Sequence, residues 1–245
     1  MNLILLEPGE VVDAARVVLR DHRALHIRTV LHAKPGDSLR VGVLDGPLGV
    51  AEAIRVDGDQ VEIQCCLGGE APPRPRIDLL LALPRPKVMK RLWAQLAALG
   101  VGRIILTNAW KVERNYFDTH VLNPDFFRPL LVEGLQQAQD TRLPEVSVHK
   151  QFKVLVEDDL DRLAPDALRL AADARGDVSM LDAVSGRERR VLLAVGPEGG
   201  WTEYETNLLK AHGFTRVSMG RRTLRADTAC VALLALAHER LRDCV

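Results

Sequence analysis

The pattern of apolar residues changes at one proline-rich segment, and this change limits the possible folds more than any other feature. The segment "LGGEAPPRPR" (67–76) combines glycines with three prolines, which is typical of a linker. Before it, "DSLRVGVLDG" (37–46), "GVAEAIRVDG" (49–58) and "QVEIQCCLGG" (60–69) are short β-type runs separated by glycine turns. We therefore expect a small all-β barrel over residues 1–71.

After the linker, expected strands alternate with expected helices. "IDLLLAL" (77–83) is a continuous apolar run, as in a strand covered on both faces, and "KVMKRLWAQLAALG" (87–100) has apolar residues at helical spacing before Gly100. Further strands are expected at "GRIILTNA" (102–109), "ALRLAADA" (167–174), "RVLLAVG" (190–196) and "TRVSMG" (215–220), and further helices over about 124–139, from Thr202, and from about Asp227 to Arg242. The alternation predicts an α/β domain over 72–245, with a mostly parallel sheet and ligand loops at the carboxyl ends of its strands.

Composition excludes several classes of protein. The 33 basic and 33 acidic residues cancel, so any binding of nucleic acid must come from local patches. Cys65, Cys66, Cys230 and Cys244 show no C-x-x-C spacing, and two adjacent cysteines in a strand point to opposite faces. The sequence therefore predicts neither a metal site nor a disulfide framework, and it is typical of a reduced, cytoplasmic protein. No apolar run is long enough to cross a bilayer, so no membrane partner is expected.

The segment "VGPEGGWTEYE" (195–205) places a glycine-rich loop between an expected strand and a helix. Thr202 and Glu205 form the T-x-x-E pattern of a capping box, so the loop covers Gly196 to Trp201. Such a loop either presses its main chain against a ligand or is only a tight connection. A P-loop would need a following Lys and Ser or Thr, and a dinucleotide-binding glycine motif would follow the first strand instead of a late one.

A second glycine loop, "SMGRRTLRADTA" (218–229), carries Arg221, Arg222 and Arg225 into the last helix. We expect Asp227 to cap that helix, with Thr228 as a neighbouring candidate. "LAADARG" (170–176) is a third loop at a strand end. Three loops at one edge of a sheet could enclose a small neutral-to-cationic cofactor with mainly backbone groups.

These segments together resemble the RsmE family of ribosomal RNA uridine-N3 methyltransferases, which belong to the SPOUT superfamily. The combination of "GPEGG" with "LRADTA" is the most specific part of the likeness. "HIRTVLHAKPGD" (26–37), "PKVMKRLWAQLAALGVGRII" (86–105) and "RLPEV" (142–146) extend it along most of the chain. The resemblance implies a PUA-like β-barrel over 1–71, an α/β knot with a trefoil-knotted C-terminus over 72–245, a homodimer, and S-adenosyl-L-methionine as cofactor.

The resemblance also implies roles for individual residues. It implies methylation of N3 of a uridine in 16S ribosomal RNA of the small subunit or its precursor, the family's target being uridine-1498. Arg225 is our candidate for stabilising charge on the uridine oxygens, and Glu198 and Asp227 are candidates for the general base. Asp227 could instead be only a helix cap, and Glu198 could instead only stabilise its own loop. The expected cofactor-binding residues are Ala171, Ala172, Gly196, Pro197, Glu198, Gly199, Gly200, Met219, Gly220, Arg222, Leu224, Thr228 and Ala229.

Basic residues early in the first domain, and others across the linker, are expected to contact RNA phosphates, although each could be a solvated surface charge. The expected RNA-binding residues are Arg16, Arg20, His22, Arg23, His26, Arg28, His32, Lys34, Lys87, Lys90 and Arg91. Among the tryptophans that could stack on a flipped base, Trp201 is preferred over Trp110, and Trp93 is expected in the core because it lies on the apolar face of a helix.

The chain departs from the family pattern at several positions. Gln136 stands where a glutamate is common, Ala226 and Asp227 replace a threonine and a glutamate, and Thr29 and His32 stand where arginines are expected. These departures leave open an alternative function, an RNA-binding or ribosome-assembly module with the same fold but another RNA target or no turnover. A Rossmann-type enzyme acting on small molecules is disfavoured by the late position of the glycine loop.

Overall fold

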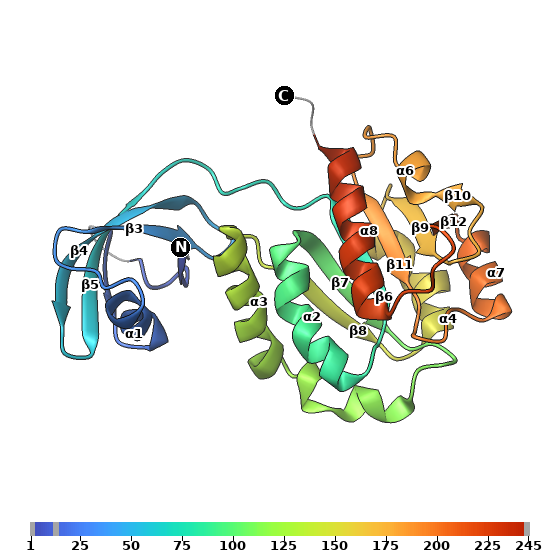
Figure 1. Cartoon of the computed structure of the whole chain (residues 1–245), viewed down its shortest axis with the longest axis horizontal. Helices are drawn as coiled ribbons and strands as arrows, with labels where there is room; N and C mark the ends of the chain where they lie inside the picture. The colour runs from blue at the N-terminus through green and yellow to red at the C-terminus, as the bar shows by residue number, and fades with distance from the viewer. Residues whose placement is uncertain (1–2, 12–14, 243–245) are drawn as a thin grey trace. The chain divides into compact units, whose positions relative to one another are not determined.

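The computed structural model describes residues 3–11 and 15–242 (Figure 1). By its internal packing the chain divides into two compact units. Unit 1 contains residues 1–74 and 132–143, and unit 2 contains residues 75–131 and 144–245. A short segment from beyond the linker, 132–143, therefore packs with the first unit.

Unit 1 is built on a curled five-stranded sheet. Its strands are β1 (Ile4–Leu6), β2 (Arg16–Leu19), β3 (Ser38–Val43), β4 (Leu48–Asp57) and β5 (Gln60–Leu67), in the order β1-β3-β4-β5-β2. All neighbours are antiparallel except β1 and β3, and the pairing of β4 with β5 shifts by one residue between Ala53 and Arg55. Such a bulge bends a strand and helps a sheet to curl. Because β1 and β2 are the edges of the described sheet, it forms a half-barrel and not the closed barrel that the sequence predicted.

The prediction that this region is all β is also wrong, because it contains helix α1 (His22–Thr29). The Asp21 side chain caps the helix by accepting a hydrogen bond from the Arg23 amide at 2.9 Å. Ala24 and Ile27, three residues apart, are both buried and point into the sheet core. The aspartate cap and this spacing were visible in the sequence, and they explain why a helix forms here.

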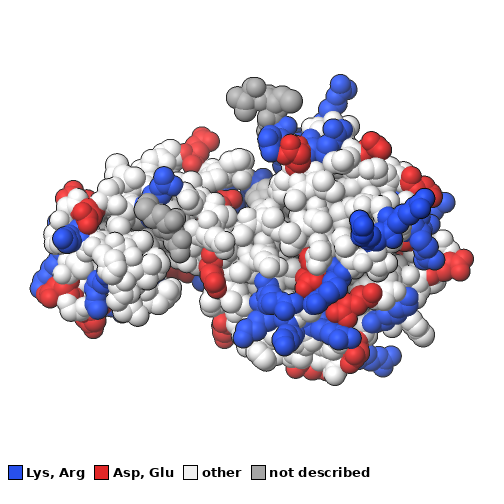
Figure 2. All heavy atoms as spheres, in the orientation of Figure 1, with Lys and Arg blue, Asp and Glu red and all other residues white. Residues whose placement is uncertain are grey.

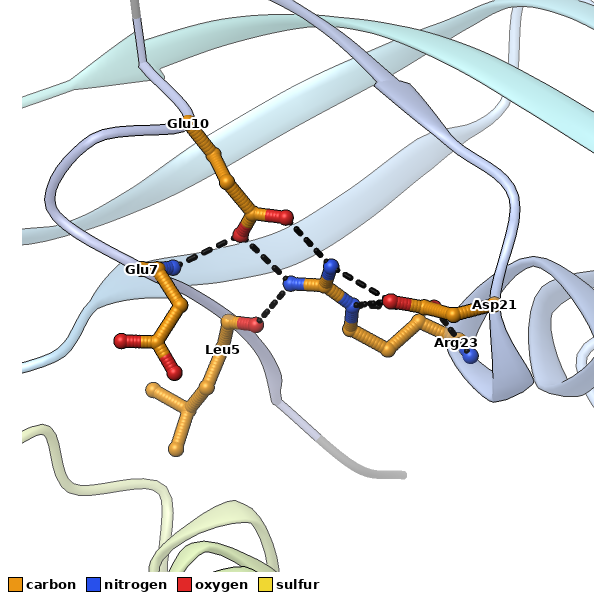
Figure 3. A network of polar contacts seen from close by, with 5 residues as sticks. All are labelled: Leu5, Glu7, Glu10, Asp21 and Arg23. Atoms are coloured by element: carbon orange, nitrogen blue, oxygen red, sulfur yellow. Dashed lines mark hydrogen bonds and ion pairs between the residues drawn. The ribbon is translucent and has the colours of Figure 1, made fainter.

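The guanidinium of Arg23 is the centre of a polar network inside unit 1 (Figure 3). It donates to the Leu5 carbonyl at 2.9 Å, to both Glu10 oxygens at 2.7 and 2.5 Å, and to Asp21 at 2.7 Å. These bonds lower the pKa of both carboxyl groups and raise the pKa of Arg23. Only 11% of the Arg23 side chain is exposed. Arg23 therefore ties β1 to α1 and is not available for RNA, which corrects the sequence-based expectation.

The segment 132–143 completes unit 1. It comprises the end of helix α3 (Pro124–Ala138) and the turn that follows. The Leu3 amide donates to the Gln136 carbonyl at 3.2 Å, and the Thr141 hydroxyl donates to the Gly46 carbonyl at 2.7 Å. Arg142 donates to the carbonyls of Pro72 and Asp45. The contact with Leu3 uses the Gln136 backbone, so it does not depend on which side chain stands at this position.

Unit 2 contains a seven-stranded sheet in which every pairing is parallel, as the alternation of strands and helices predicted. The order is β10-β12-β9-β11-β6-β7-β8. The strands are β6 (Ile77–Ala82), β7 (Val101–Thr107), β8 (Glu145–His149), β9 (Leu168–Ala172), β10 (Val178–Ser179), β11 (Val191–Val195) and β12 (Thr215–Ser218). All six residues of β6 and all five of β11 are buried, as expected for central strands covered on both faces.

Helices cover this sheet and connect its strands. They are α2 (Pro86–Ala98), α4 (Phe152–Val154), α5 (Leu160–Leu163), α6 (Met180–Ala183), α7 (Glu203–Ala211) and α8 (Ala226–Leu241), with the short turns η2 (Arg114–Asp118), η3 (His120–Leu122) and η4 (Leu155–Asp159). Helix α8 packs beside α2 and against β11, β6 and α6 (Figure 1). Trp93, on α2, is fully buried and stacks on Phe127 at 4.6 Å, so its expected place in the core is confirmed.

The expected helix starts are confirmed at α7 and corrected at α8. At α7 the Thr202 hydroxyl accepts from the Glu205 amide while the Glu205 carboxylate accepts from the Thr202 amide, which completes the capping box. At α8 the N-cap residue is Arg225, without a side-chain cap bond, and Asp227 lies inside the first turn. The expectation that Asp227 or Thr228 caps this helix is therefore wrong, although an acidic residue in the first turn still favours the helix dipole.

The described cysteines are unpaired. Cys65 is buried and its neighbour Cys66 is exposed, which confirms that they point to opposite faces of β5, and Cys230 is buried in α8. Cys244 lies outside the described residues. Within residues 3–11 and 15–242, no three His, Cys, Asp or Glu side chains are grouped to hold a metal ion. None of the helices in the described part of the chain is long and apolar enough to cross a membrane.

Candidate active site

Three loops of unit 2 meet at one edge of its sheet. Strands β12, β9 and β11 are neighbours and parallel, so the loops that follow them leave the sheet on the same side. We call these loops A (172–176, after β9), B (196–201, after β11) and C (218–225, after β12). Together they line a cavity of about 400 Å³, which is within the usual size range of small-molecule sites. The structure thus brings together the three loops that the sequence singled out.

Most of the expected cofactor-binding residues line this cavity. They are Ala172, Gly196, Pro197, Glu198, Gly199, Gly200, Met219, Gly220, Arg222, Leu224 and Ala229. Two expected residues do not. Ala171 is 2% exposed and paired within the sheet, because it lies inside β9, and Thr228 is exposed on α8 outside the cavity lining.

Other lining residues were missed by the sequence analysis. They are Lys111, Asp173, Ala174, Arg175, Val195, Trp201, Val217, Ser218, Thr223, Ala226 and Leu233. Val195 and Ser218 are the last residues of β11 and β12, and Val217 precedes Ser218, so counting the strand ends as part of the site would have found all three. Lys111 could not be found this way, because it comes from the segment after β7, two strands away from β11.

Loop B is shaped by its glycines. The Gly200 amide donates to the Pro197 carbonyl at 2.7 Å, and Gly200 has a φ of 70°, a conformation that side chains disfavour. A Cβ on Gly196 would lie 3.0 Å from the Trp201 ring. The glycines therefore let the main chain turn tightly while an indole packs directly on it.

Trp201 is only 5% exposed, and its ring stacks on Phe152 with 5.4 Å between centroids. It therefore has no free face for an RNA base, which corrects its expected role. Its indole nitrogen Nε1 is buried beside the cavity and has no hydrogen-bond partner among the described residues. A buried donor without a partner is unusual, and here it suits a ligand with an acceptor atom.

Charged groups surround the cavity on two sides. Lys111 Nζ donates to the Gly199 carbonyl at 2.6 Å and so holds loop B from outside the sheet edge. In loop A, the Asp173 carboxylate accepts from the Arg175 amide at 2.8 Å and from Arg216 at 3.0 Å. Only 12% of the Asp173 side chain is exposed. The cavity thus combines backbone groups and apolar side chains with two carboxylates, Asp173 and Glu198, of which Asp173 is already hydrogen-bonded.

A second hollow of about 610 Å³ adjoins the cavity and shares Glu198, Thr223 and Leu224 with it. We call it the basic hollow, because its other lining residues are Arg85, Lys87, Val88, Arg91 and Arg225. Figure 2 shows Lys and Arg side chains gathered where α2 and α8 begin, which is where these residues lie. Arg85 was not singled out by the sequence, since nothing in its neighbourhood distinguishes it from other surface arginines.

The three expected catalytic residues lie around this basic hollow. Arg225 is 68% exposed and its guanidinium is 3.3 Å from Asp227, whereas Glu198 forms an ion pair with Arg85 at 2.9 Å. Asp227 also accepts from Arg91 at 3.0 Å and from the Thr228 amide at 2.9 Å. Although burial opposes ionisation, these hydrogen bonds and the two guanidinium groups keep the pKa of Asp227 below its ordinary value.

A general base for an imide proton would need a raised pKa, so the lowered pKa of Asp227 does not support that role. Its carboxylate instead joins α8 to α2 through Arg91 and lies against the Arg225 guanidinium. The Asp227 carboxylate is therefore occupied by two guanidinium groups.

The expected RNA-binding residues separate into two groups. In unit 2, Lys87, Lys90 and Arg91 are exposed at the start of α2 beside the basic hollow. In unit 1, Arg16 pairs with Glu62 at 3.2 Å and Arg20 donates to Gln60 at 3.3 Å. Among the other expected RNA-binding residues of unit 1, three are exposed (His22, His32 and Lys34) and two are half-buried (His26 and Arg28).

Comparison with known proteins agrees with this site. A family model described as an RNA methyltransferase domain matches residues 71–238, which include all three loops and the basic hollow. Ribosomal RNA small subunit methyltransferase E of Treponema pallidum is 31% identical over 245 residues, covering 97% of this chain and 92% of that protein. The chain belongs to the RsmE family. The family resemblance seen in its glycine and arginine motifs is thereby confirmed.

Other members of the RsmE family are more distant. Ribosomal RNA small subunit methyltransferase E 1 of Borreliella burgdorferi is 25% identical, covering 98% of this chain and 99% of its own. The solved structure of the Neisseria gonorrhoeae methyltransferase E bound to S-adenosyl methionine superposes with a TM-score of 0.80 at 20% identity, covering both chains completely. A Legionella pneumophila protein solved with the same cofactor gives a TM-score of 0.75 at 22% identity, over 97% of this chain and 96% of its own. These two structures show that the RsmE fold extends over the whole chain.

Proposed function

We propose that this protein is an S-adenosylmethionine-dependent methyltransferase that methylates N3 of a uridine in 16S ribosomal RNA, the family target being uridine-1498. The observation that carries the proposal is the pairing of two hollows in unit 2. A cavity built from glycine-rich backbone adjoins a hollow lined by arginine and lysine, and they share Glu198 and Leu224. The first suits a compact cofactor and the second suits an anionic substrate.

The cofactor cavity has the groups that S-adenosylmethionine needs. Loops A, B and C would hold it, with backbone groups of loop B and the unpartnered Trp201 Nε1 available as hydrogen-bond partners. Leu224 and Leu233 supply apolar surface for the flat adenine ring. The cofactor supplies an electrophilic methyl group on a sulfonium sulfur. Transfer of such a group is an in-line displacement, so the main task of the protein is to position the two reactants.

Arg225 is the proposed catalytic residue. N3 of uridine holds its proton near neutral pH, and its loss spreads negative charge onto the two flanking carbonyl oxygens. A guanidinium beside those oxygens stabilises this charge, because it stays protonated and donates two parallel hydrogen bonds. Arg225 lines the basic hollow next to the shared residue Leu224, and its guanidinium donates a hydrogen bond to the Asp227 carboxylate.

Glu198 is the proposed proton acceptor. It lines both hollows, and its carboxylate is one-third exposed at their boundary. Arg85 pairs with it at 2.9 Å and fixes where the carboxylate points. On this proposal Glu198 accepts the N3 proton and releases it to solvent after the nitrogen–carbon bond has formed.

The RNA is proposed to bind the basic hollow of unit 2 and, separately, the basic residues of unit 1. Phosphate contacts would come from Lys87, Lys90 and Arg91 in unit 2. The exposed and half-buried basic residues of unit 1 would add further contacts, namely Arg16, Arg20, His22, His26, Arg28, His32 and Lys34. Contacts of this kind make RNA affinity fall steeply with salt.

We also propose that the chain shares the domain roles, the knot and the dimer of the RsmE family. Residues 1–71 would act as a PUA-like RNA-binding domain, and residues 72–245 would form a SPOUT domain with a trefoil knot. The protein would act in the cytoplasm. The knot is supported by the path of the chain, which leaves outer strand β12 and returns so that α8 packs on the inner strands β11 and β6. A homodimer through α8 is supported by its outward face, where Val231 is 37% exposed beside the small residues Ala232 and Ala235.

The proposal is tested by methylating small ribosomal subunits with labelled S-adenosylmethionine. We expect Arg225→Ala to lower the rate constant about a hundredfold or more, because an oxyanion-type donor is removed, while cofactor affinity measured by calorimetry stays unchanged. Arg221→Ala is the matched control, since Arg221 lies in the same loop but lines neither hollow. Normal methylation by Arg225→Ala would refute the catalytic role.

The same assay distinguishes the alternative function. A wild-type protein that binds both cofactor and small subunits but transfers no methyl group would be an RNA-binding or assembly module. Label in a nucleotide other than 3-methyluridine would show a methyltransferase with another target.

A further inference from the structure

A third hollow of unit 2 has an aromatic lining that neither the cofactor cavity nor the basic hollow uses. It has a volume of about 710 Å³ and lies between the segment after β7 and the start of α7. We call it the aromatic groove. The residues that matter are Trp110, Val112, Arg114, Phe152, Lys153 and Tyr204.

Two large aromatic side chains of the groove are open to solvent. Trp110 is 85% exposed and Tyr204 is 59% exposed, whereas Phe152 and Val112 are buried at 8% and 7% and form its floor. Tryptophan is a highly buried residue on average, so an indole with nearly all of its surface in water is an informative exception. An exposed aromatic surface on an apolar floor marks a binding site.

The backbone beneath Trp110 is held firmly. Its amide donates to the Glu205 carboxylate at 2.7 Å, and the same carboxylate accepts from the Thr202 amide and hydroxyl at 2.7 and 2.8 Å. Glu205 lines the groove, but it is only 3% exposed and its carboxylate already accepts these three hydrogen bonds. The exposed indole therefore projects from a main chain that is already fixed, so binding has to order only the side chain.

The charged groups that the groove presents to solvent are cationic. Arg114 is exposed at the start of η2, and Lys153 is 63% exposed, with Glu157 3.8 Å away on the same helical segment. An indole, a phenol and two cations at one hollow match the two parts of a nucleotide, a flat base and a phosphate. A phosphate group would offset the charge of both cations, so the charge favours an anionic ligand.

The groove lies beside the cofactor cavity. Strands β7 and β11 flank β6 in parallel, so the segments after β7 and β11 leave the sheet at the same edge. Lys111, next to Trp110, donates to the Gly199 carbonyl of loop B and lines the cofactor cavity. Thr202 and Glu205, on the other wall, directly follow loop B. A nucleotide in the groove would therefore lie near the bound cofactor.

We propose that the aromatic groove binds an unpaired nucleotide of the substrate RNA that flanks the methylated uridine. Its base stacks on Trp110 and Tyr204, and its phosphate contacts Arg114 and Lys153. The inference rests on the proposed function and adds a substrate subsite to it. It also reassigns the stacking role that the sequence gave to Trp201, because Trp201 is buried and Trp110 is exposed.

The test measures binding of two RNA probes, single-stranded hexauridylate and a fully paired duplex of the same length. Removing a stacking side chain lowers affinity for unpaired bases about tenfold or more, so Trp110→Ala and Tyr204→Ala should each weaken hexauridylate binding by that factor. Trp110→Phe keeps a ring and should stay within about threefold of wild type. Leu181→Ala is the matched control, because Leu181 is 43% exposed in unit 2 but lines none of the three hollows.

Affinity for the duplex should be unchanged in all four variants, because paired bases offer no free face. The inference is overturned if Trp110→Ala binds hexauridylate like wild type, or if it weakens the duplex equally. It is also overturned if sedimentation shows that Trp110→Ala dissociates a wild-type dimer, since the groove would then join two copies. Methylation by the wild-type protein is measured in parallel. Its absence would refute the proposed function, whereas its presence with unaltered hexauridylate binding would refute only the groove.

Discussion

The Glu205 carboxylate connects the segment after β7 with the start of α7, so its removal should destabilise unit 2. It accepts hydrogen bonds from the Trp110 amide, the Thr202 amide and the Thr202 hydroxyl, all between 2.7 and 2.8 Å. Glu205→Ala leaves two backbone amides without this partner and removes half of the capping box. A buried donor that loses its partner costs about 1–3 kcal/mol. Because the Thr202 hydroxyl can rotate to another acceptor, we expect a total loss of about 3 kcal/mol in the free energy of unfolding.

The assay is urea denaturation followed by tryptophan fluorescence. Trp93, Trp110 and Trp201 all belong to unit 2, so the signal follows the unfolding of that unit alone. Glu203→Ala is the matched control, because Glu203 occupies the same first turn of α7 but is exposed. Its loss should cost less than about 1 kcal/mol, the value of a charge near a helix dipole.

The reasoning about Glu205 is refuted if Glu205→Ala lies within about 1 kcal/mol of wild type, or if it equals Glu203→Ala. Either result would show that water or another group satisfies the Trp110 and Thr202 amides after the carboxylate is removed.

Two further predictions concern other parts of the chain. Gly196→Ala places a methyl group 3.0 Å from the Trp201 ring, so calorimetry should show S-adenosylmethionine affinity reduced by about tenfold or more. Gly199→Ala is the control, because its methyl group meets only the movable Lys111 side chain and should lower the affinity clearly less. Equal losses of affinity would contradict the account of loop B. In unit 1, hydrogen bonding to Arg23 lowers the pKa of Glu10 below its ordinary value of 4.5, so the stability that Glu10 adds is present above pH 4.5 and is lost as the pH falls through its folded-state pKa. Amide exchange of β1 and α1 should therefore show Glu10→Gln less protected than wild type at pH 7, with a difference that shrinks below pH 4.5 instead of growing.

Much of unit 2 could be predicted from sequence because its local patterns agree with the fold. The apolar run of β6, the Thr202–Glu205 capping box and the glycine after α2 each fix one element boundary by local chemistry. The parallel order of the strands then brings loops A, B and C to one edge. Unit 1 was predicted less well for two reasons. The basic residues that follow the Asp21 cap resemble a loop and obscure the start of the helix, and the closure of a sheet depends on long-range pairing.

In the candidate site, too, local features were predictable and long-range contacts were not. Backbone positions of loop B and loop C were predictable because glycine and strand ends are local features. The roles of individual side chains were not, because they depend on partners far away in the sequence. Arg23 is occupied by Glu10, Asp227 by Arg91 from α2, and Glu198 by Arg85. No pattern near any of these residues indicates its partner.

The central claim is most directly tested by mass spectrometry of 16S ribosomal RNA from a strain that lacks this chain. The account predicts that one 3-methyluridine disappears from the digest and returns when the wild-type gene is restored, but not when the restored gene carries Arg225→Ala. An unchanged content of 3-methyluridine in the deletion strain would contradict the account, because the cavity of loops A, B and C would then serve another reaction.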